Sequence, residues 1–191
     1  MRLIYIISFF FIIVFKFEYS INAKEIWLLD EDLSVIKFEV PVFLAKNVTG
    51  QFNHIEGFIE LNEKEEIAKT LILAKIESID INYKKYYELI LSDTFLNKDE
   101  FANAIVDTIF TPISYRKEEK NKITIRLGLN GIYGWIPYNF EIIYLAPELV
   151  QVKGDFKISR TFFKIGKDKW YSTSILKEDI EINTNLFFKK R

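Results

Sequence analysis

The sequence has 191 residues, of which 49% are hydrophobic, and its 18 Phe and 10 Tyr supply enough apolar side chains for one well-packed domain. The formal net charge of −1 argues against nucleic acid as a partner, and the absence of cysteine excludes disulfides, thiol chemistry and cysteine metal sites. His54 is the single histidine, so no histidine pair can bind a metal, and a surface or structural role is the preferred interpretation.

The first 23 residues have the pattern of a secretory signal peptide. A basic start precedes an apolar run from Leu3 to Phe15, and a more polar stretch then leads to the small residue Ala23. Because Lys16 ends a run that would need about 20 apolar residues to span a bilayer, cleavage after Ala23 is favoured over a membrane anchor. We therefore expect a signal peptide at 1–23 and one exported domain at 24–191.

From Trp27 to Val42 the sequence predicts a half-buried strand. Ile36, Phe38 and Val40 share one face and alternate with polar residues, while Pro41 indicates a sheet edge or a bulge.

The next strand region, 48–61, is interrupted near His54 and Gly57, where the apolar face changes sides. Such a change predicts a bulge or a sharp bend. Strand composition returns at 71–81. Apolar and aromatic residues then recur at helical spacing at 83–90, which predicts an amphipathic helix with a packed tyrosine face.

The second half of the chain alternates apolar and polar residues in several short segments, with a turn signal at Asn130-Gly131. We expect strands at 105–112, 123–129, 136–144, 149–166 and 180–186. Seven or eight strands with short turns favour a barrel or a sandwich. In a closed sheet of about eight strands, side chains can fill the interior or leave room for one small ligand, and the periodicity allows both.

Arg160 stands out because it lies on the apolar side of its strand, together with Phe156 and Ile158. One interpretation places it at a rim, with a buried stem and a charged head in water or paired with a carboxylate. The other interpretation has it contact a ligand or its headgroup. The position of Arg160 in its strand favours the rim. A family resemblance makes the rim and the ligand contact equally favoured.

The sequence contains no recognisable catalytic arrangement. Its paired carboxylates lack the spacing of acid–base sites or calcium loops, and no glycine-rich phosphate loop follows a strand. An enzyme is therefore disfavoured. If the protein were a hydrolase or isomerase for a hydrophobic substrate, Arg160, Asp80 and Tyr138 would be its best polar candidates.

Short motifs in a fixed order along the chain carry a family resemblance. The matching positions are Asp30, Ser34, Ile36, Phe38, Val40, Val48, Gly50, Phe52, Ile76, Ser78, Ile79, Asp80, Asp93, Leu96, Phe101, Phe110, Leu127, Gly131, Ile158, Arg160, Phe162, Ile165, Asp179, Ile180 and Ile182. Together they cover 27–186 and resemble the YceI-like family of exported, polyisoprenoid-binding proteins. The chain departs from that family at Leu33 and Phe95, where histidines are common, at Ser92, where an arginine is usual, and at 161–164, which lacks a Phe-Gly pair.

The resemblance implies an all-β fold, an extended antiparallel lipocalin-like β-barrel of about eight strands with one or two short inserted helices. It also implies a non-enzymatic carrier in the bacterial periplasm, without a cofactor or metal, that binds an isoprenoid quinone or a similar long-chain lipid. A transient membrane-surface contact and a homodimer are compatible with it. The residues that we expect to contact the lipid, from strand parity and the resemblance, are Phe38, Val40, Phe52, Ile59, Ile76, Phe110, Leu127, Phe140, Ile142, Ile158, Arg160 and Phe162.

Two alternatives from other functional classes stay open at this point. The first is a filled barrel that serves as an envelope interaction module without a ligand. The second is the enzyme for a hydrophobic substrate. An open apolar interior would favour the carrier, and a close-packed interior would favour the module.

Overall fold

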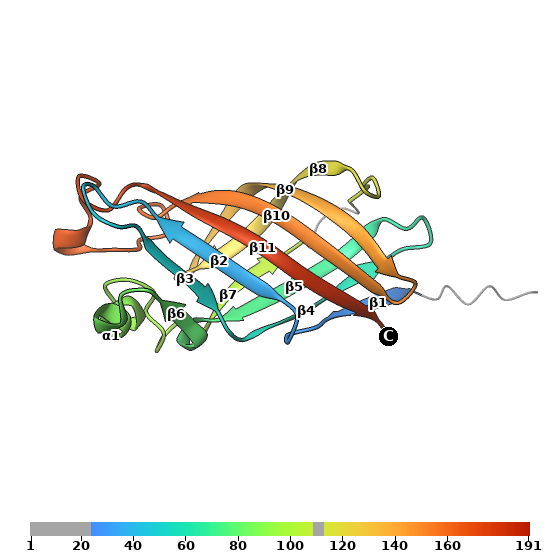
Figure 1. The fold of residues 1–191 in the computed structure, drawn as a ribbon, viewed down its shortest axis with the longest axis horizontal. Helices are drawn as coiled ribbons and strands as arrows, with labels where there is room; N and C mark the ends of the chain where they lie inside the picture. The colour runs from blue at the N-terminus through green and yellow to red at the C-terminus, as the bar shows by residue number, and fades with distance from the viewer. Residues whose placement is uncertain (1–23, 109–112) are drawn as a thin grey trace, which may run out of the picture.

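The computed structural model describes residues 24–108 and 113–191. The expected signal peptide at 1–23 and the expected lipid contact Phe110 lie outside the described residues. Within the described part, eleven strands form one antiparallel sheet (Figure 1).

Eight strands close into a barrel, because β1 pairs with β4 on one side and with the end of β11 on the other. In pairing order they are β1 (Glu25–Leu29), β4 (Ile55–Leu61), β5 (Ile67–Lys75), β7 (Asn103–Asp107), β8 (Lys120–Leu129), β9 (Ile132–Ala146), β10 (Leu149–Ser159) and β11 (Asp179–Lys190). The remaining three, β2 (Val35–Val40), β3 (Val48–Phe52) and β6 (Ile79–Ile81), extend the sheet from the first half of β11. The predicted antiparallel barrel of about eight strands is confirmed.

The interruption predicted near His54 is a change of strand partner. The chain leaves β3, which pairs with β2 and β6, and two residues later enters β4, which pairs with β1 and β5. A short 3₁₀ helix, Ile76–Ser78 (η1), makes the reverse change between β5 and β6. Ser78 joins the two bends, because its carbonyl accepts from the Asn53 amide at 3.2 Å and its hydroxyl from the His54 amide at 3.0 Å.

The turn between β8 and β9 follows directly from Asn130-Gly131. Both residues have positive φ angles, 53° and 73°, which this residue pair tolerates and which match the twist of a hairpin. The buried Asn130 side chain also donates to the carbonyls of Phe95, Phe163 and Lys164, at 3.1–3.3 Å. The turn therefore anchors two loops at this end of the barrel.

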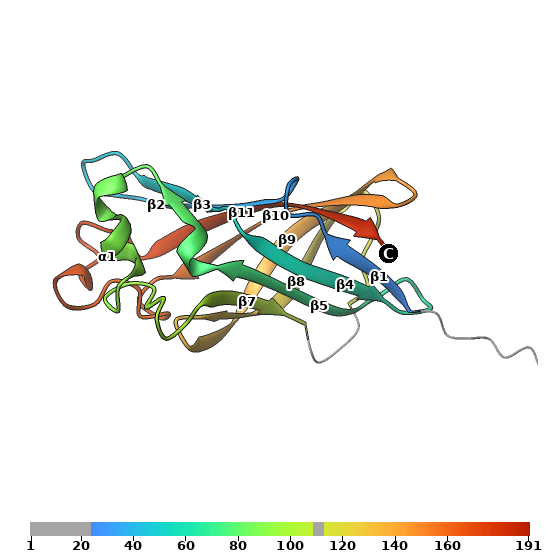
Figure 2. The same ribbon diagram turned by 90° about the horizontal axis from the view of Figure 1, so that it is seen from below.

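The amphipathic helix predicted at 83–90 is only partly α-helical. It consists of a 3₁₀ turn, Lys84–Tyr86 (η2), and one helical segment, Tyr87–Leu91 (α1). Figures 1 and 2 place α1 at one end of the barrel, beside the β2–β3 loop and the long loop between β10 and β11, which contains the 3₁₀ turn Asp168–Trp170 (η3). In the part of the chain that the structure describes, no helix is long and apolar enough to cross a membrane.

The opposite half of the barrel is closely packed by aromatic side chains. Tyr138 stacks on Phe140 with ring centroids 5.4 Å apart and meets Phe156 edge-on at 5.8 Å. Gly154, directly beside Tyr138, provides the space for this cluster, since a β-carbon there would overlap the Tyr138 ring. Phe188, from β11, is fully buried in the same half of the barrel.

We expect Gly154→Ala to lower the free energy of unfolding by roughly 1–3 kcal/mol, because the added methyl group must displace the Tyr138 ring. In a strand without such crowding, the same change would increase stability. Urea denaturation of the variant and of Lys153→Ala, its exposed neighbour, checks this expectation. A Gly154→Ala protein at least as stable as the unchanged protein would contradict the packing described here.

Candidate functional site

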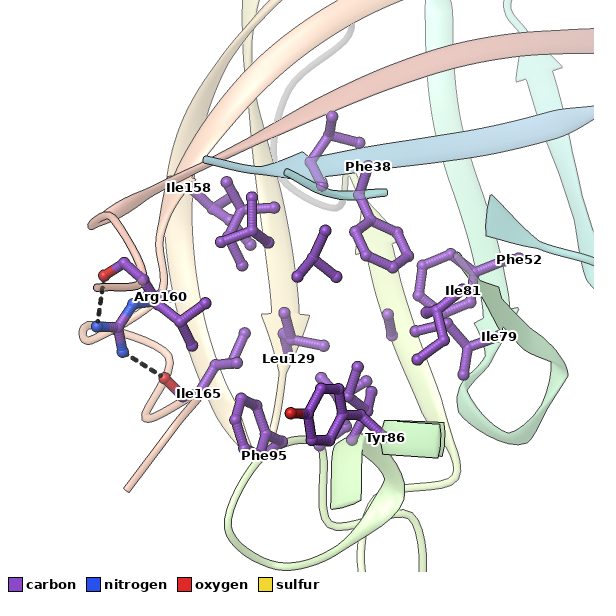
Figure 3. Close-up of a pocket in the computed structure, with 18 of the residues that line it drawn as sticks. Phe38, Phe52, Ile79, Ile81, Tyr86, Phe95, Leu129, Ile158, Arg160 and Ile165 are labelled. Carbon is purple, nitrogen blue, oxygen red and sulfur yellow. Dashed lines mark hydrogen bonds between the residues drawn. The ribbon is translucent and has the colours of Figure 1, made fainter. Parts of the chain in front are cut away.

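The end of the barrel beside α1 encloses a cavity of about 510 Å³, here called the main cavity. Its wall is almost entirely aliphatic and aromatic. In Figure 3, Phe52, Ile79 and Ile81 lie on one side of the space, and Ile158 and Ile165 lie on the opposite side. The strands place these side chains inside because alternate residues of each strand face the barrel interior.

The few polar groups of the main cavity lie at its open end. Lys46, Lys85 and Tyr86 border the cavity and are exposed, and the Tyr83 hydroxyl donates to the Lys46 carbonyl at 3.0 Å. Deeper in the barrel the wall is apolar. The arrangement suits a molecule with a long apolar part and a small polar head.

A smaller cavity of about 80 Å³ adjoins the main cavity and lies towards the packed end of the barrel. The two share Ile36, Ile72, Val106 and Phe156 in their walls. Four hydroxyl-bearing residues also line the smaller cavity: Thr70, Thr108, Tyr138 and Thr184.

Three of these hydroxyls have hydrogen-bond partners within the protein. The Tyr138 and Thr184 hydroxyls are 2.8 Å apart, and Thr108 accepts from the Thr70 amide at 2.9 Å. Burial raises the pKa of Tyr138 to about 12, so this phenol is neutral at ordinary pH. The polar groups of the smaller cavity therefore form a structural network.

Arg160 is buried, so the interpretation as a solvated rim residue is wrong. Only 1% of it is exposed, and its guanidinium donates to six backbone carbonyls of the loop that leads to β11. The acceptors are Lys177, Ile165, Trp170, Tyr171, Ser172 and Leu176, at 2.8–3.1 Å. Burial lowers the pKa of Arg160, and the nearby Glu178 carboxylate partly offsets this effect. Its N–H groups are thus engaged by the backbone, which gives Arg160 a structural role. Arg160 also lines the main cavity, and its expected contact with a lipid stays a prediction.

The other residues expected to contact a lipid fall into distinct groups. The main cavity is lined by Phe38, Val40, Phe52, Leu127 and Ile158, with Arg160 at its border. The smaller cavity is lined by Ile59, Phe140 and Ile142. Ile76 is buried, but it borders neither cavity.

Phe162 requires a correction, because 52% of it is exposed. Strand β10 ends at Ser159, so the alternation that would have placed Phe162 inside stops before it is reached. Phe163 takes the fully buried position instead, and the two rings meet edge-on at 4.9 Å.

Sequence reasoning missed the part of the cavity wall that lies outside the strands. Leu89 and Ile90 from α1, and Trp170 and Leu176 from the β10–β11 loop, line the main cavity. The helical spacing at 83–90 was the one sequence signal for this part of the wall. The apolar face of that helix is packed as predicted, and it packs around the cavity opening.

The three polar residues considered for an enzyme do not converge. Asp80 pairs with Lys84 on the surface, Tyr138 bonds to Thr184 in the smaller cavity, and Arg160 is used by backbone carbonyls. Within 24–108 and 113–191, no group of three His, Cys, Asp or Glu residues could hold a metal ion.

Comparison with known proteins gives one family and a set of similar folds. The sequence model of the YceI-like domain matches residues 27–188.

Burkholderia cenocepacia BcnA is 16% identical with a TM-score of 0.73, over 83% of this chain and 98% of that chain. A polyisoprenoid binding domain from Saccharophagus degradans, implicated in plant cell wall breakdown, is 13% identical with a TM-score of 0.67, over 86% and 98%. The Campylobacter jejuni YCEI protein is 21% identical with a TM-score of 0.64, over 79% and 89%. No curated protein matches the chain in sequence. The family match confirms the resemblance predicted from the motifs, and the structural matches confirm the fold.

We expect Arg160→Lys to lower the free energy of unfolding by roughly 2–4 kcal/mol, because a lysine ammonium cannot reach carbonyls spread around a planar guanidinium. Arg116→Lys is the matched control. Arg116 is exposed and pairs with Glu119 at 3.2 Å, so its replacement should change stability by less than about 1 kcal/mol. Chemical denaturation measures both variants, and equal effects would show that the carbonyl contacts of Arg160 are not stabilising.

Proposed function

Since this chain belongs to the YceI-like domain family, we propose that it is a non-enzymatic carrier that holds a long apolar lipid of isoprenoid type inside its barrel. The observation that carries the proposal is the main cavity, about 510 Å³ of space with an apolar wall. A volume of this size is typical of small-molecule sites, whereas a filled interaction module would have a close-packed interior. The polyisoprenoid binding domain among the similar structures supports the same ligand class.

The binding energy in this proposal comes from burial of the lipid chain. Each 100 Å² of apolar surface removed from water contributes about 2.5 kcal/mol. Because this term needs no directional contact, a long isoprenoid quinone or a similar lipid can bind tightly to a wall with few polar groups. The polar residues at the opening, Lys46, Tyr83, Lys85 and Tyr86, are the groups that would orient the head.

The proposed location is the periplasm, reached by export through a signal peptide at 1–23 that is then removed. One chain closes the barrel by itself, so the cavity does not require the homodimer, which stays a prediction from the resemblance. A transient contact with a membrane would load and unload the lipid.

The test of this function is mass spectrometry of organic extracts from protein purified from its native source, combined with uptake of an isoprenoid quinone. We expect a co-purified polyprenyl lipid or saturable uptake. Trp170 is one of three tryptophans and lines the main cavity, so quinone quenching that is lost in a Trp170→Phe variant reports binding near the opening. Folded protein that contains no lipid and takes up no quinone would overturn the proposal.

Filling the cavity should weaken lipid binding without disturbing the outer surface. Ala104 lines the main cavity from β7, so Ala104→Phe inserts a ring into the space that the lipid chain would occupy. We expect at least a tenfold increase in the quinone Kd. Ala102→Phe, at an exposed position two residues earlier, is the matched control and should bind like the unchanged protein. Equal affinities for the two folded variants would mean that the lipid does not occupy this cavity.

A further inference from the structure

Three segments surround the opening of the main cavity and are here called the mouth rim: 41–47, 83–91 and 167–177. They touch one another at several points. Val42 forms an isolated β-bridge with Leu176, and the Phe43 amide donates to the Ile175 carbonyl at 2.9 Å. The rings of Tyr86 and Trp170 meet edge-on with centroids 6.5 Å apart. The mouth rim is therefore one continuous surface, at the end of the molecule away from the C-terminus (Figures 1 and 2).

This surface collects exposed apolar side chains. Among the described residues, five of the eleven large hydrophobic residues that are exposed belong to it: Phe43, Leu44, Tyr86, Tyr171 and Ile175. Leu44 is the extreme case, with 90% of its surface in water and a φ of 52°, a conformation that non-glycine residues adopt rarely. An apolar side chain presented in this way is poorly explained by stability of the domain, and it needs a partner that removes it from water.

The mouth rim is also basic in a domain that is acidic. Its three segments contain six lysines and two carboxylates, a net charge of +4. Residues 24–191 as a whole contain 24 basic and 26 acidic residues, a net charge of −2. The remainder of the domain therefore has an excess of carboxylates, and positive charge is concentrated around the cavity opening.

Each rim segment contributes an aromatic ring or a lysine to a cation–π pair. Lys85 lies 4.9 Å from the centroid of the Tyr86 ring, Lys169 lies 5.7 Å from that of Trp170, and Lys177 lies 5.0 Å from that of Phe43. Aromatic rings next to lysines, with aliphatic residues beyond them, are the composition of segments that bind at the interface of a bilayer. A protein partner would more often meet a flatter patch with few lysines at its centre.

We propose that the mouth rim docks on an anionic lipid surface, with Leu44, Tyr171 and Ile175 among the headgroups and the lysines near the phosphates. This proposal rests on the proposed lipid-carrier function and specifies where the lipid enters. Each lysine near an anionic surface adds a weak, screened attraction, and the apolar side chains add their burial, so binding is reversible and sensitive to salt. Docking in this orientation places the cavity opening against the bilayer, so that an apolar chain moves between the two without crossing bulk water.

The test is flotation of the 24–191 domain with vesicles of phosphatidylethanolamine and phosphatidylglycerol. We expect co-flotation that falls as salt rises, and little binding to vesicles of phosphatidylcholine alone. The double variant Leu44→Glu with Tyr171→Glu should lose at least tenfold in vesicle partitioning. Its matched control is Leu28→Glu with Leu145→Glu, which changes two exposed leucines outside the mouth rim by the same charge and should float like the unchanged protein.

Uptake of a short-chain, water-soluble quinone, measured without vesicles, separates the two proposals. Neither Leu44 nor Tyr171 lines the cavity, so the rim variant should keep this uptake while losing flotation. Normal uptake by a domain that does not float, or equal flotation of both double variants, overturns the docking surface and leaves the carrier function intact. Flotation by a domain that takes up no quinone supports the docking surface and overturns the carrier function.

Discussion

The buried guanidinium of Arg160 makes the contacts on which the cavity end of the barrel depends. Six carbonyls from the β10–β11 loop converge on it, so one side chain at the end of a strand determines the path of a segment with little regular structure. That loop supplies Trp170 and Leu176 to the cavity wall and Tyr171 and Ile175 to the mouth rim. A buried charge without a hydrogen-bonded carboxylate is costly, and here the oriented carbonyl dipoles compensate the guanidinium. The loop and the arginine therefore depend on each other.

The barrel divides into a packed half and a hollow half. In the packed half, Tyr138, Phe140, Phe156 and Phe188 leave only the smaller cavity of about 80 Å³ between them, and Gly154 provides the space for the Tyr138 ring. In the hollow half, small residues such as Ala74 and Ala104 pair across neighbouring strands and leave the main cavity between the walls. The partner change at His54 and η1 separates these halves, because it brings β2, β3 and β6 into the wall only at the hollow end. A packed core and an open cavity are thus formed by different parts of one sheet.

The sequence was most informative where a local rule determines the structure. Alternation predicted the inward faces of β2 and β11, and Asn130-Gly131 predicted the hairpin turn. The sequence was least informative where contacts between distant segments determine the role of a side chain. The acceptors of Arg160 lie up to seventeen residues away in a loop without periodicity, so no local pattern distinguished a loop anchor from a ligand contact. Phe162 was misplaced because parity was continued past the end of β10. The cavity itself depends on how side-chain volumes add up across strands, which periodicity does not report.

The proposed function requires that an isoprenoid chain occupies the hollow half of the barrel. Photo-crosslinking with an isoprenoid quinone that carries a photoreactive group along its chain, followed by peptide mapping, tests this claim most directly. Crosslinks should fall on peptides of β2, β6 and α1, which contain Phe38, Ile81 and Leu89. Crosslinks confined to the outer surface, for example around the exposed rings of Tyr133 and Trp135, would contradict it.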